Sequence, residues 1–329
     1  MKVVYEAIKN FAKQFAWEPR IENAGGLKPS NSFTRLIVAG MGGSHLAADL
    51  LKMSRPDRNL LIHSDYGLPP LPDMAPGKSA VIASSYSGNT EETLDAYDAA
   101  KRQGLSRAAV AVGGKLLERA AQDGVPYIRM PDTGIQPRSA LGFGFKALLA
   151  LMGEEVALRD AGKLAEILDP AVYEEEGKEL AGRLKGYVPV IYTSLRNAAI
   201  GYNWKIKFNE TGKIPAFANV FPELNHNEMT GFDVQDSTRP LSQGFFFLFL
   251  KDPADHPKVV RRMEATVSLY RDRRLPAAVL ELVERDANLF YKIFSSLILA
   301  DWAAYFTAKG YGVEAEQVPM VEEFKKRIA

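Results

Sequence analysis

The sequence has no cysteine, only four histidines and almost no net charge. Without cysteine the chain cannot form disulfides, and cysteine-based metal sites and nucleophiles are excluded. The 41 Lys and Arg residues nearly balance the 40 Asp and Glu residues. A chain without a net field does not attract nucleic acid or an anionic membrane, so neither is an expected partner, and any anion must be held by a local site.

Long hydrophobic runs are also missing. The apolar run at residues 245–250 is far too short to span a bilayer. Residues 1–17 alternate charged and apolar side chains, which predicts an amphipathic helix rather than a signal peptide. We therefore expect a cytoplasmic protein.

What is present is the composition of a globular protein, with 47% hydrophobic and 25% charged residues. A chain of 329 residues exceeds what one core usually serves, which favours two domains. Short apolar stretches alternate with helical ones, and this order is typical of parallel sheets. The predicted strands are 36–39, 60–63, 79–83, 108–112, 127–130, 188–193, 244–250 and 277–281.

Helical and charged sequence between residues 142 and 185 interrupts this alternation. We therefore predict two α/β domains, residues 1–155 with the leading helix and residues 156–329 with a closing helix from Pro319. The helix predicted at 289–308 is apolar on most sides and is expected to be buried.

A hydroxyl-rich turn follows the strand at 79–83. It contains Ser85, Ser87 and Thr90 around Gly88, and a helix follows. Hydroxyls, backbone N–H groups and a helix N-terminus together suit a phosphate group, and Thr90 is placed to cap the helix. The alternative is a plain helix-capping cluster without a ligand.

A second glycine turn, residues 40–44, suggests a dinucleotide site, and Asp65 after the next strand could hold a ribose. The pattern lacks its third glycine, however, and no Walker lysine pattern is present. The hydroxyl-rich turn has no role in a dehydrogenase, so the phosphate interpretation is favoured.

The second half of the chain supplies acid–base groups. Glu210 ends a predicted helix shortly before Gly212, where the helix dipole disfavours a carboxylate. His226 lies among polar residues and can exchange protons near neutral pH. Alternatively Glu210 is a solvated surface residue, or His226 binds a metal with Glu223 and Glu228, although nothing nearby completes such a site.

These residues together resemble the bifunctional phosphoglucose/phosphomannose isomerase family, a branch of the sugar-isomerase-domain (SIS) proteins. The similarity runs in the same order along nearly the whole chain. The matching stretches are 40–44, 85–94, 137–141, 208–210, 222–227 and 319–325.

The resemblance implies two tandem SIS-type α/β/α sandwich domains and an aldose–ketose isomerase acting on a phosphorylated hexose, without metal or cofactor. It implies that Glu210 moves a proton between C1 and C2 through a cis-enediol. Sugar-ring opening would be assisted by Lys325 and by His226, the latter from the partner subunit of a homodimer. The implied phosphate ligands are Ser85, Ser87 and Thr90, and the implied sugar-pocket residues are Gly43, Ser44 and Arg138.

One position departs from the family pattern. Val318 stands where the bifunctional members carry a threonine, and valine cannot hydrogen-bond a sugar hydroxyl. Glucose 6-phosphate is therefore the expected substrate, and mannose 6-phosphate is left open. Two other functions compete: a sugar-phosphate sensor without catalysis, and an isomerase of another phosphosugar.

Overall fold

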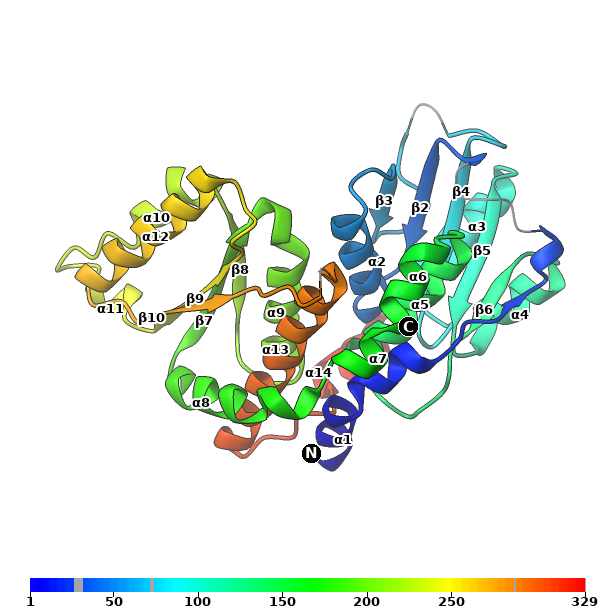
Figure 1. Ribbon diagram of the computed structural model, residues 1–329. Helices are drawn as coiled ribbons and strands as arrows, with labels where there is room; N and C mark the ends of the chain where they lie inside the picture. Colours follow the sequence, from blue (N-terminus) through cyan, green and yellow to red (C-terminus); the bar gives the residue numbers. More distant parts are fainter. Residues whose placement is uncertain (27–31, 72–73, 287, 329) are drawn as a thin grey trace. The chain divides into compact units, whose positions relative to one another are not determined.

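The computed structural model describes residues 1–26, 32–71, 74–286 and 288–328. The chain forms two compact units, which Figure 1 shows with their helices and strands labelled. The N-unit comprises Asn10–Leu168, and the C-unit comprises Met1–Lys9 together with Asp169–Ala329. The division therefore follows residue 168, not residue 155, and the leading helix belongs to the C-unit.

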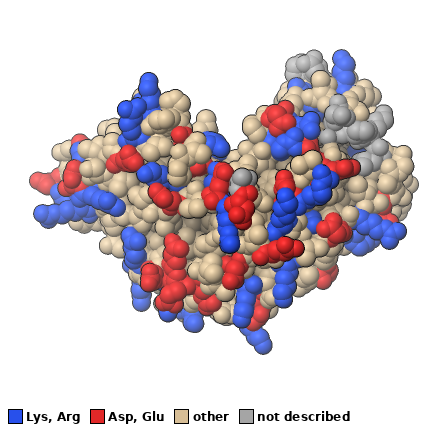
Figure 2. All heavy atoms as spheres, viewed as in Figure 1, with Lys and Arg blue, Asp and Glu red and all other residues tan. Residues whose placement is uncertain are grey.

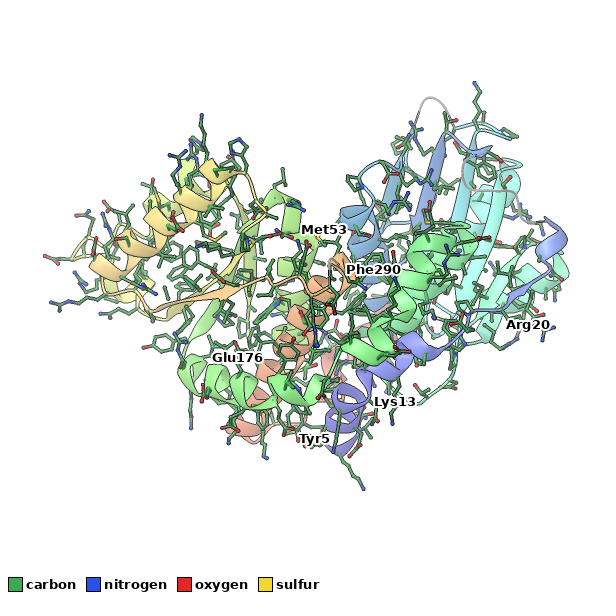
Figure 3. All side chains as sticks on the ribbon, in the orientation of Figure 1. Tyr5, Lys13, Arg20, Met53, Glu176 and Phe290 are labelled. Carbon is green, nitrogen blue, oxygen red and sulfur yellow. The ribbon has the colours of Figure 1, made fainter. Side chains whose placement is uncertain are left out.

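The position of the leading helix has a simple packing reason. Helix α1 (Lys2–Lys9) ends well before residue 17, and a separate 3₁₀ helix, Phe11–Ala16, follows it. Tyr5 on α1, labelled in Figure 3, packs its ring against Trp302 at 5.1 Å between centroids. Its hydroxyl also donates to Glu174 at 3.2 Å. An amphipathic pattern predicts that a helix has an apolar face, but not which core that face joins.

The N-unit contains a sheet with strand order β1-β6-β5-β4-β2-β3 among its described residues. All neighbouring strands are parallel except β1, which pairs antiparallel to β6. The strands are β1 (Ile21–Glu22), β2 (Arg35–Ala39), β3 (Leu60–His63), β4 (Ser79–Ser84), β5 (Ser106–Ala111) and β6 (Tyr127–Arg129). The predicted strands of this half are thus confirmed, with ends shifted by one or two residues.

Helices cover both faces of this sheet, as expected for buried parallel strands. Ala83 and Ala109 pack with Tyr97 on the face covered by α3 and α4, whereas α2 and α5 pack together on the other face. The helices are α2 (Gly43–Ser54), α3 (Glu91–Arg102), α4 (Gly114–Gln122), α5 (Leu141–Leu151), α6 (Glu155–Gly162) and α7 (Leu164–Ile167).

The C-unit has a parallel sheet of order β10-β9-β7-β8. Helices α8, α9 and α13 lie on one face and α12 on the other (Figure 1). The strands are β7 (Val188–Ser194), β8 (Phe217–Phe221), β9 (Phe245–Lys251) and β10 (Ala277–Glu281). The helices are α8 (Glu174–Leu184), α9 (Ala198–Glu210), α10 (Glu228–Gly231), α11 (Arg239–Ser242), α12 (Pro257–Asp272), α13 (Leu289–Tyr311) and α14 (Pro319–Ile328).

Strand β8 falls outside the predicted strands. It lies at the sheet edge, and Phe217 and Ala218 are exposed, so it has no continuous apolar run. The prediction of a buried helix near residues 289–308 is confirmed. Helix α13 is long and apolar enough to cross a membrane by length and composition, but 89% of its most apolar stretch is buried within the protein. Such burial is typical of the core helix of a folded domain.

Charges of both signs are interspersed on the surface. On the face shown in Figure 2, Lys and Arg side chains alternate with Asp and Glu side chains on both units. This distribution agrees with the formal net charge of +1.

Candidate functional site

The hydroxyl-rich turn lies at the carboxyl end of β4, where α3 begins. Ser85 is buried, and its Oγ lies 2.8 Å from Thr90 Oγ1 and accepts from the Gly88 N–H at 3.1 Å. Ser87 is exposed, and its Oγ accepts from the Asn89 N–H at 3.2 Å. Thr90 occupies the N-cap position of α3, but its side chain makes no capping hydrogen bond and bonds Ser85 instead. Two of the three hydroxyls are therefore bonded to each other at a helix N-terminus, and Ser87 is bonded to the backbone of the same turn.

Gly88 is required by both conformation and space. Its φ is +70°, and an added Cβ would stand 1.8 Å from the Gly113 carbonyl oxygen. The turn is also bonded to its neighbour, because Val112 N–H donates to Tyr86 O at 2.9 Å and Leu116 N–H to Gly88 O at 2.9 Å. The turn is thus held in one conformation before any ligand arrives, and such preorganisation lowers the cost of binding.

The other predicted pocket residues of the N-unit converge on the same turn. Ser44 Oγ accepts from the Tyr86 N–H at 2.8 Å. A Cβ on Gly43 would lie 2.8 Å from the Arg138 backbone nitrogen, so glycine permits the close approach of these two segments. Arg138 is only 3% exposed. Because β2 and β4 are parallel neighbours, their carboxyl ends place both glycine turns at one edge of the sheet.

The turn at the corresponding place in the C-unit carries carboxylates instead of hydroxyls. Strand β9 holds the place in its sheet that β4 holds in the N-unit, and it is followed by Asp252 and Asp255. Lys292 donates to Asp252 at 2.8 Å, and Ser194 donates to Asp255 at 2.9 Å. These groups are buried, and burial raises the pKa of Asp255. A turn closed by two carboxylates repels phosphate, so the N-unit turn is the better anion site.

Glu210 is the last residue of α9, as the sequence predicts, and it is half-buried. One turn earlier, Lys207 forms a buried ion pair with Asp301 of α13, with 2.7 Å between Nζ and Oδ1. The backbone N–H groups of Thr211 and Gly212 donate to the Lys207 carbonyl at 2.9 and 3.0 Å. The end of the helix that carries Glu210 is therefore fixed on several sides.

His226 lies in a 3₁₀ turn after β8 and is exposed. The two carboxylates considered as its metal-binding neighbours have other partners. Glu228 accepts from Tyr192 at 2.6 Å, and Glu223 accepts from Asn227 at 2.8 Å. Burial is the largest cause of a raised pKa at Tyr192, and the electrostatic interaction with Tyr270 and the hydrogen bond to Glu228 raise this pKa further. Among the described residues, no group of three or more His, Asp or Glu is arranged to hold a metal.

Lys325 lies on α14, which begins at Pro319 as predicted. Its side chain is exposed and pairs with Glu322 at 2.8 Å, one turn earlier on the same helix. Such a pair between two exposed groups is weak, so it does not fix the ammonium group in place.

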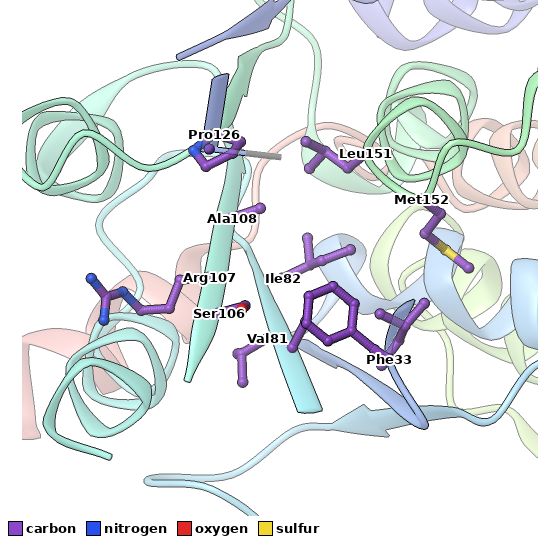
Figure 4. Close-up of a pocket in the computed structure, with 12 residues that line it drawn as sticks. Phe33, Val81, Ile82, Ser106, Arg107, Ala108, Pro126, Leu151 and Met152 are labelled. Carbon is purple, nitrogen blue, oxygen red and sulfur yellow. The ribbon is translucent and has the colours of Figure 1, made fainter. Parts of the chain in front are cut away.

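The cavity drawn in Figure 4 lies elsewhere in the N-unit. It has a volume of about 30 Å³ and is lined by Ala80, Ser106 and Phe33, near the amino ends of β4 and β5. This space accommodates roughly one water molecule and no hexose. It is therefore a small gap in the packing, at the end of the strands opposite to the hydroxyl-rich turn.

Comparison with solved structures agrees with this architecture. The tagatose-6-phosphate ketose/aldose isomerase of Escherichia coli superposes with a TM-score of 0.71 at 15% identity, over 95% of this chain and 94% of that one. Residues 173–328 match the family model described as the bacterial phospho-glucose isomerase C-terminal SIS domain. Two mainly parallel sheets flanked by helices, together with the match to a SIS-domain family model, define a protein of the SIS class.

Relatives that match over their full length identify the family within this class. The bifunctional phosphoglucose/phosphomannose isomerase of Aquifex aeolicus is 33% identical over 100% of this chain and 99% of its own length. The protein of the same name from Caldicellulosiruptor bescii is 32% identical over 99% of both chains. The chain belongs to the bifunctional phosphoglucose/phosphomannose isomerase family.

Proposed function

We propose that the protein is an aldose–ketose isomerase that interconverts glucose 6-phosphate, and also mannose 6-phosphate, with fructose 6-phosphate. The observation that carries this proposal is full-length membership of the family combined with the preformed hydroxyl turn at β4. Charged sugar phosphates do not cross membranes unaided, so we place the reaction in the cytoplasm.

The proposed chemistry assigns one task to each group. Ser85, Ser87 and Thr90 anchor the phosphate, which holds the far end of the sugar still. Glu210 takes the proton from C2 of the open-chain aldose and returns it to C1 of the cis-enediol, while a second proton moves from the C2 hydroxyl to the C1 oxygen. The same carboxylate must reach both carbons on one face, and no metal is needed for this transfer. The residues assigned to the sugar pocket are Gly43, Ser44 and Arg138, and those assigned to ring opening are His226 and Lys325.

Incubation with fructose 6-phosphate in the presence of EDTA tests the reaction directly. We expect both glucose 6-phosphate and mannose 6-phosphate to form, and separation of the two aldose phosphates measures the epimer preference. Glucose 6-phosphate alone would assign the selectivity to the region of Val318, whereas both products would show that valine admits the second epimer. Binding without turnover would favour a sensor or another phosphosugar, and activity lost with EDTA would contradict the metal-free route.

We also propose that the active form is a homodimer in which His226 serves the partner's site. Strands β7 and β8 are parallel, so α9 between them must run back across the sheet. Helix α9, whose last residue is Glu210, therefore ends at the edge of the sheet where β8 begins (Figure 1). His226 follows the end of β8 and thus lies at the opposite edge. Five residues of strand put roughly 13 Å between these edges, so Glu210 and His226 of one chain do not lie side by side.

Mixing two inactive variants tests this arrangement. In a two-fold dimer of Glu210→Gln with His226→Ala, one of the two shared sites keeps both native side chains. We expect an equimolar mixture, after subunit exchange, to recover about a quarter of wild-type activity, because random pairing makes half of the dimers mixed. Mixing either variant with itself is the control. No recovery from a mixture shown to contain mixed dimers would contradict the shared site.

A further inference from the structure

Lys213 connects two parts of the C-unit that are far apart in sequence. Its ammonium group donates to the main-chain carbonyl of Glu210 at 2.6 Å and also to that of Gln317. Gln317 lies one residue before Val318 and two before α14, the helix that carries Lys325. A single side chain therefore bridges the end of α9 and the start of α14.

The end of α9 needs such a donor. The last four carbonyl groups of a helix have no partner within the helix. At this end the Lys207 carbonyl accepts from the Thr211 and Gly212 N–H groups, and the Phe208 carbonyl accepts from the Ile214 N–H at 3.2 Å. The Glu210 carbonyl receives the lysine ammonium instead, and a cation is also favourable at the negative end of the helix dipole.

The backbone conformation of Lys213 is the second observation. Its φ is +58°, a region that residues with a Cβ rarely occupy and glycine occupies freely. The adjacent Gly212 is not in this region; there, an added Cβ would stand 2.8 Å from the Phe208 carbonyl oxygen. A lysine therefore occupies the left-handed position, where glycine would fit without strain. Residues held in such conformations concentrate at functional sites, and here the side chain makes two bonds that glycine cannot make.

We propose that Lys213 is a positioning residue of the isomerase, a role that rests on the proposed function of Glu210. Its ammonium group ties the helix end that carries the base to the segment that leads into α14. The tie sets the position of the Glu210 carboxylate relative to Lys325 and Val318. Displacement of a reacting group by about 1 Å can lower the rate by about two orders of magnitude, so loss of the tie acts on turnover.

Lys213→Gly tests this role, because it removes the ammonium group and relieves the backbone. We expect kcat for fructose 6-phosphate to fall by about 10- to 100-fold, with KM changed less than about threefold because the phosphate turn is intact. Thermal stability should not fall, since glycine suits φ +58°. Lys213→Arg, which keeps a donor, should recover much of the activity. Arg274→Gly is the matched control, because exposed Arg274 has φ +61° in the same unit.

Hydrogen exchange of the amides at residues 313–325 gives a readout that does not depend on activity. Faster exchange in Lys213→Gly together with a lower kcat supports the proposal. Faster exchange with wild-type kcat overturns the positioning role, and a lower kcat with unchanged exchange overturns the tie as its cause. If the wild-type protein does not isomerise fructose 6-phosphate, the proposed function fails instead, and the exchange data still report whether Lys213 holds α14.

Discussion

Replacement of Glu210 by glutamine should remove nearly all isomerase activity, lowering kcat by about 10²- to 10⁴-fold. Glutamine has the size of glutamate and can donate a hydrogen bond, but it cannot act as a base toward the proton on C1 or C2. Glu210 is the last residue of α9, and the contacts that fix this helix end are made by Lys207, Thr211, Gly212 and the Glu210 main chain. The fold should therefore be retained.

Initial rates with fructose 6-phosphate, measured at saturating substrate, check this expectation. Glu179→Gln is the matched control, because Glu179 is exposed on α8 of the same unit and the chemical change is identical. Substrate binding by the Glu210→Gln variant should stay close to that of wild type, since the proposed phosphate ligands lie in the turn of the N-unit. A Glu210→Gln protein with wild-type kcat would remove Glu210 from the role of base.

Replacement of Lys292 by methionine should lower the free energy of unfolding of the C-unit by about 3–5 kcal/mol. Lys292 and Asp252 are 1% and 2% exposed, and their charged atoms lie 2.8 Å apart. Methionine keeps the length of the side chain but leaves Asp252 buried without its cation. An uncompensated buried charge is among the most destabilising single changes in proteins.

The pH dependence has a definite sign. Burial alone would raise the pKa of Asp252, but the hydrogen bonds from Lys292, the Ala254 N–H and Asn197, with the lysine charge, lower it below the ordinary 3.8. A carboxyl group with a lowered pKa stabilises the folded state above its unfolded pKa, and this contribution is lost as the pH falls through the folded value. The wild-type contribution should therefore be complete at pH 7 and decline only below about pH 4.

Urea unfolding followed by tryptophan fluorescence measures the effect, since Trp204 and Trp302 are both buried in the C-unit. Lys251→Met is the control, because Lys251 pairs with the 54% exposed Glu264 and should leave the unfolding midpoint nearly unchanged. Adding Asp252→Asn to Lys292→Met should recover part of the loss, because it removes the orphaned charge. Equal midpoints for the wild-type and Lys292→Met proteins would contradict this account.

The fold could be predicted wherever burial follows from a continuous apolar run. The strands at Leu60–His63 and Ala277–Glu281 begin and end where the sequence predicts, and α13 is buried as its composition predicts. Strand β8 could not be predicted in this way, because only one of its five residues is buried at this sheet edge. The placement of α1 in the C-unit could not be predicted either, since the ring of Tyr5 packs against Trp302, almost 300 residues away in the sequence.

The candidate site also contains features that local sequence predicts and features that depend on tertiary contacts. The hydroxyls of the phosphate turn are neighbours in sequence, so their clustering at Ser85 and Thr90 could be predicted from the turn itself. Charged residues such as Lys292, Lys207 and Lys213 carry no such signal, because a lysine in a sequence is by default a solvated surface group. The one signal near Lys213 was Gly212, which correctly predicted a helix end close to residue 210.

The sequence by itself therefore determined the secondary structure of the buried elements, the mainly parallel sheets, the hydroxyl-rich turn and the family. These depend on interactions among residues a few positions apart or on apolar runs, which are local properties. Only the tertiary structure decided which unit holds the leading helix, why one βα turn suits an anion while its counterpart is closed by Asp252 and Lys292, and how Lys213 joins Glu210 to Gln317. Each of these depends on pairs of polar or aromatic groups brought together across long stretches of chain, where geometry alone determines whether a charge is solvated or paired.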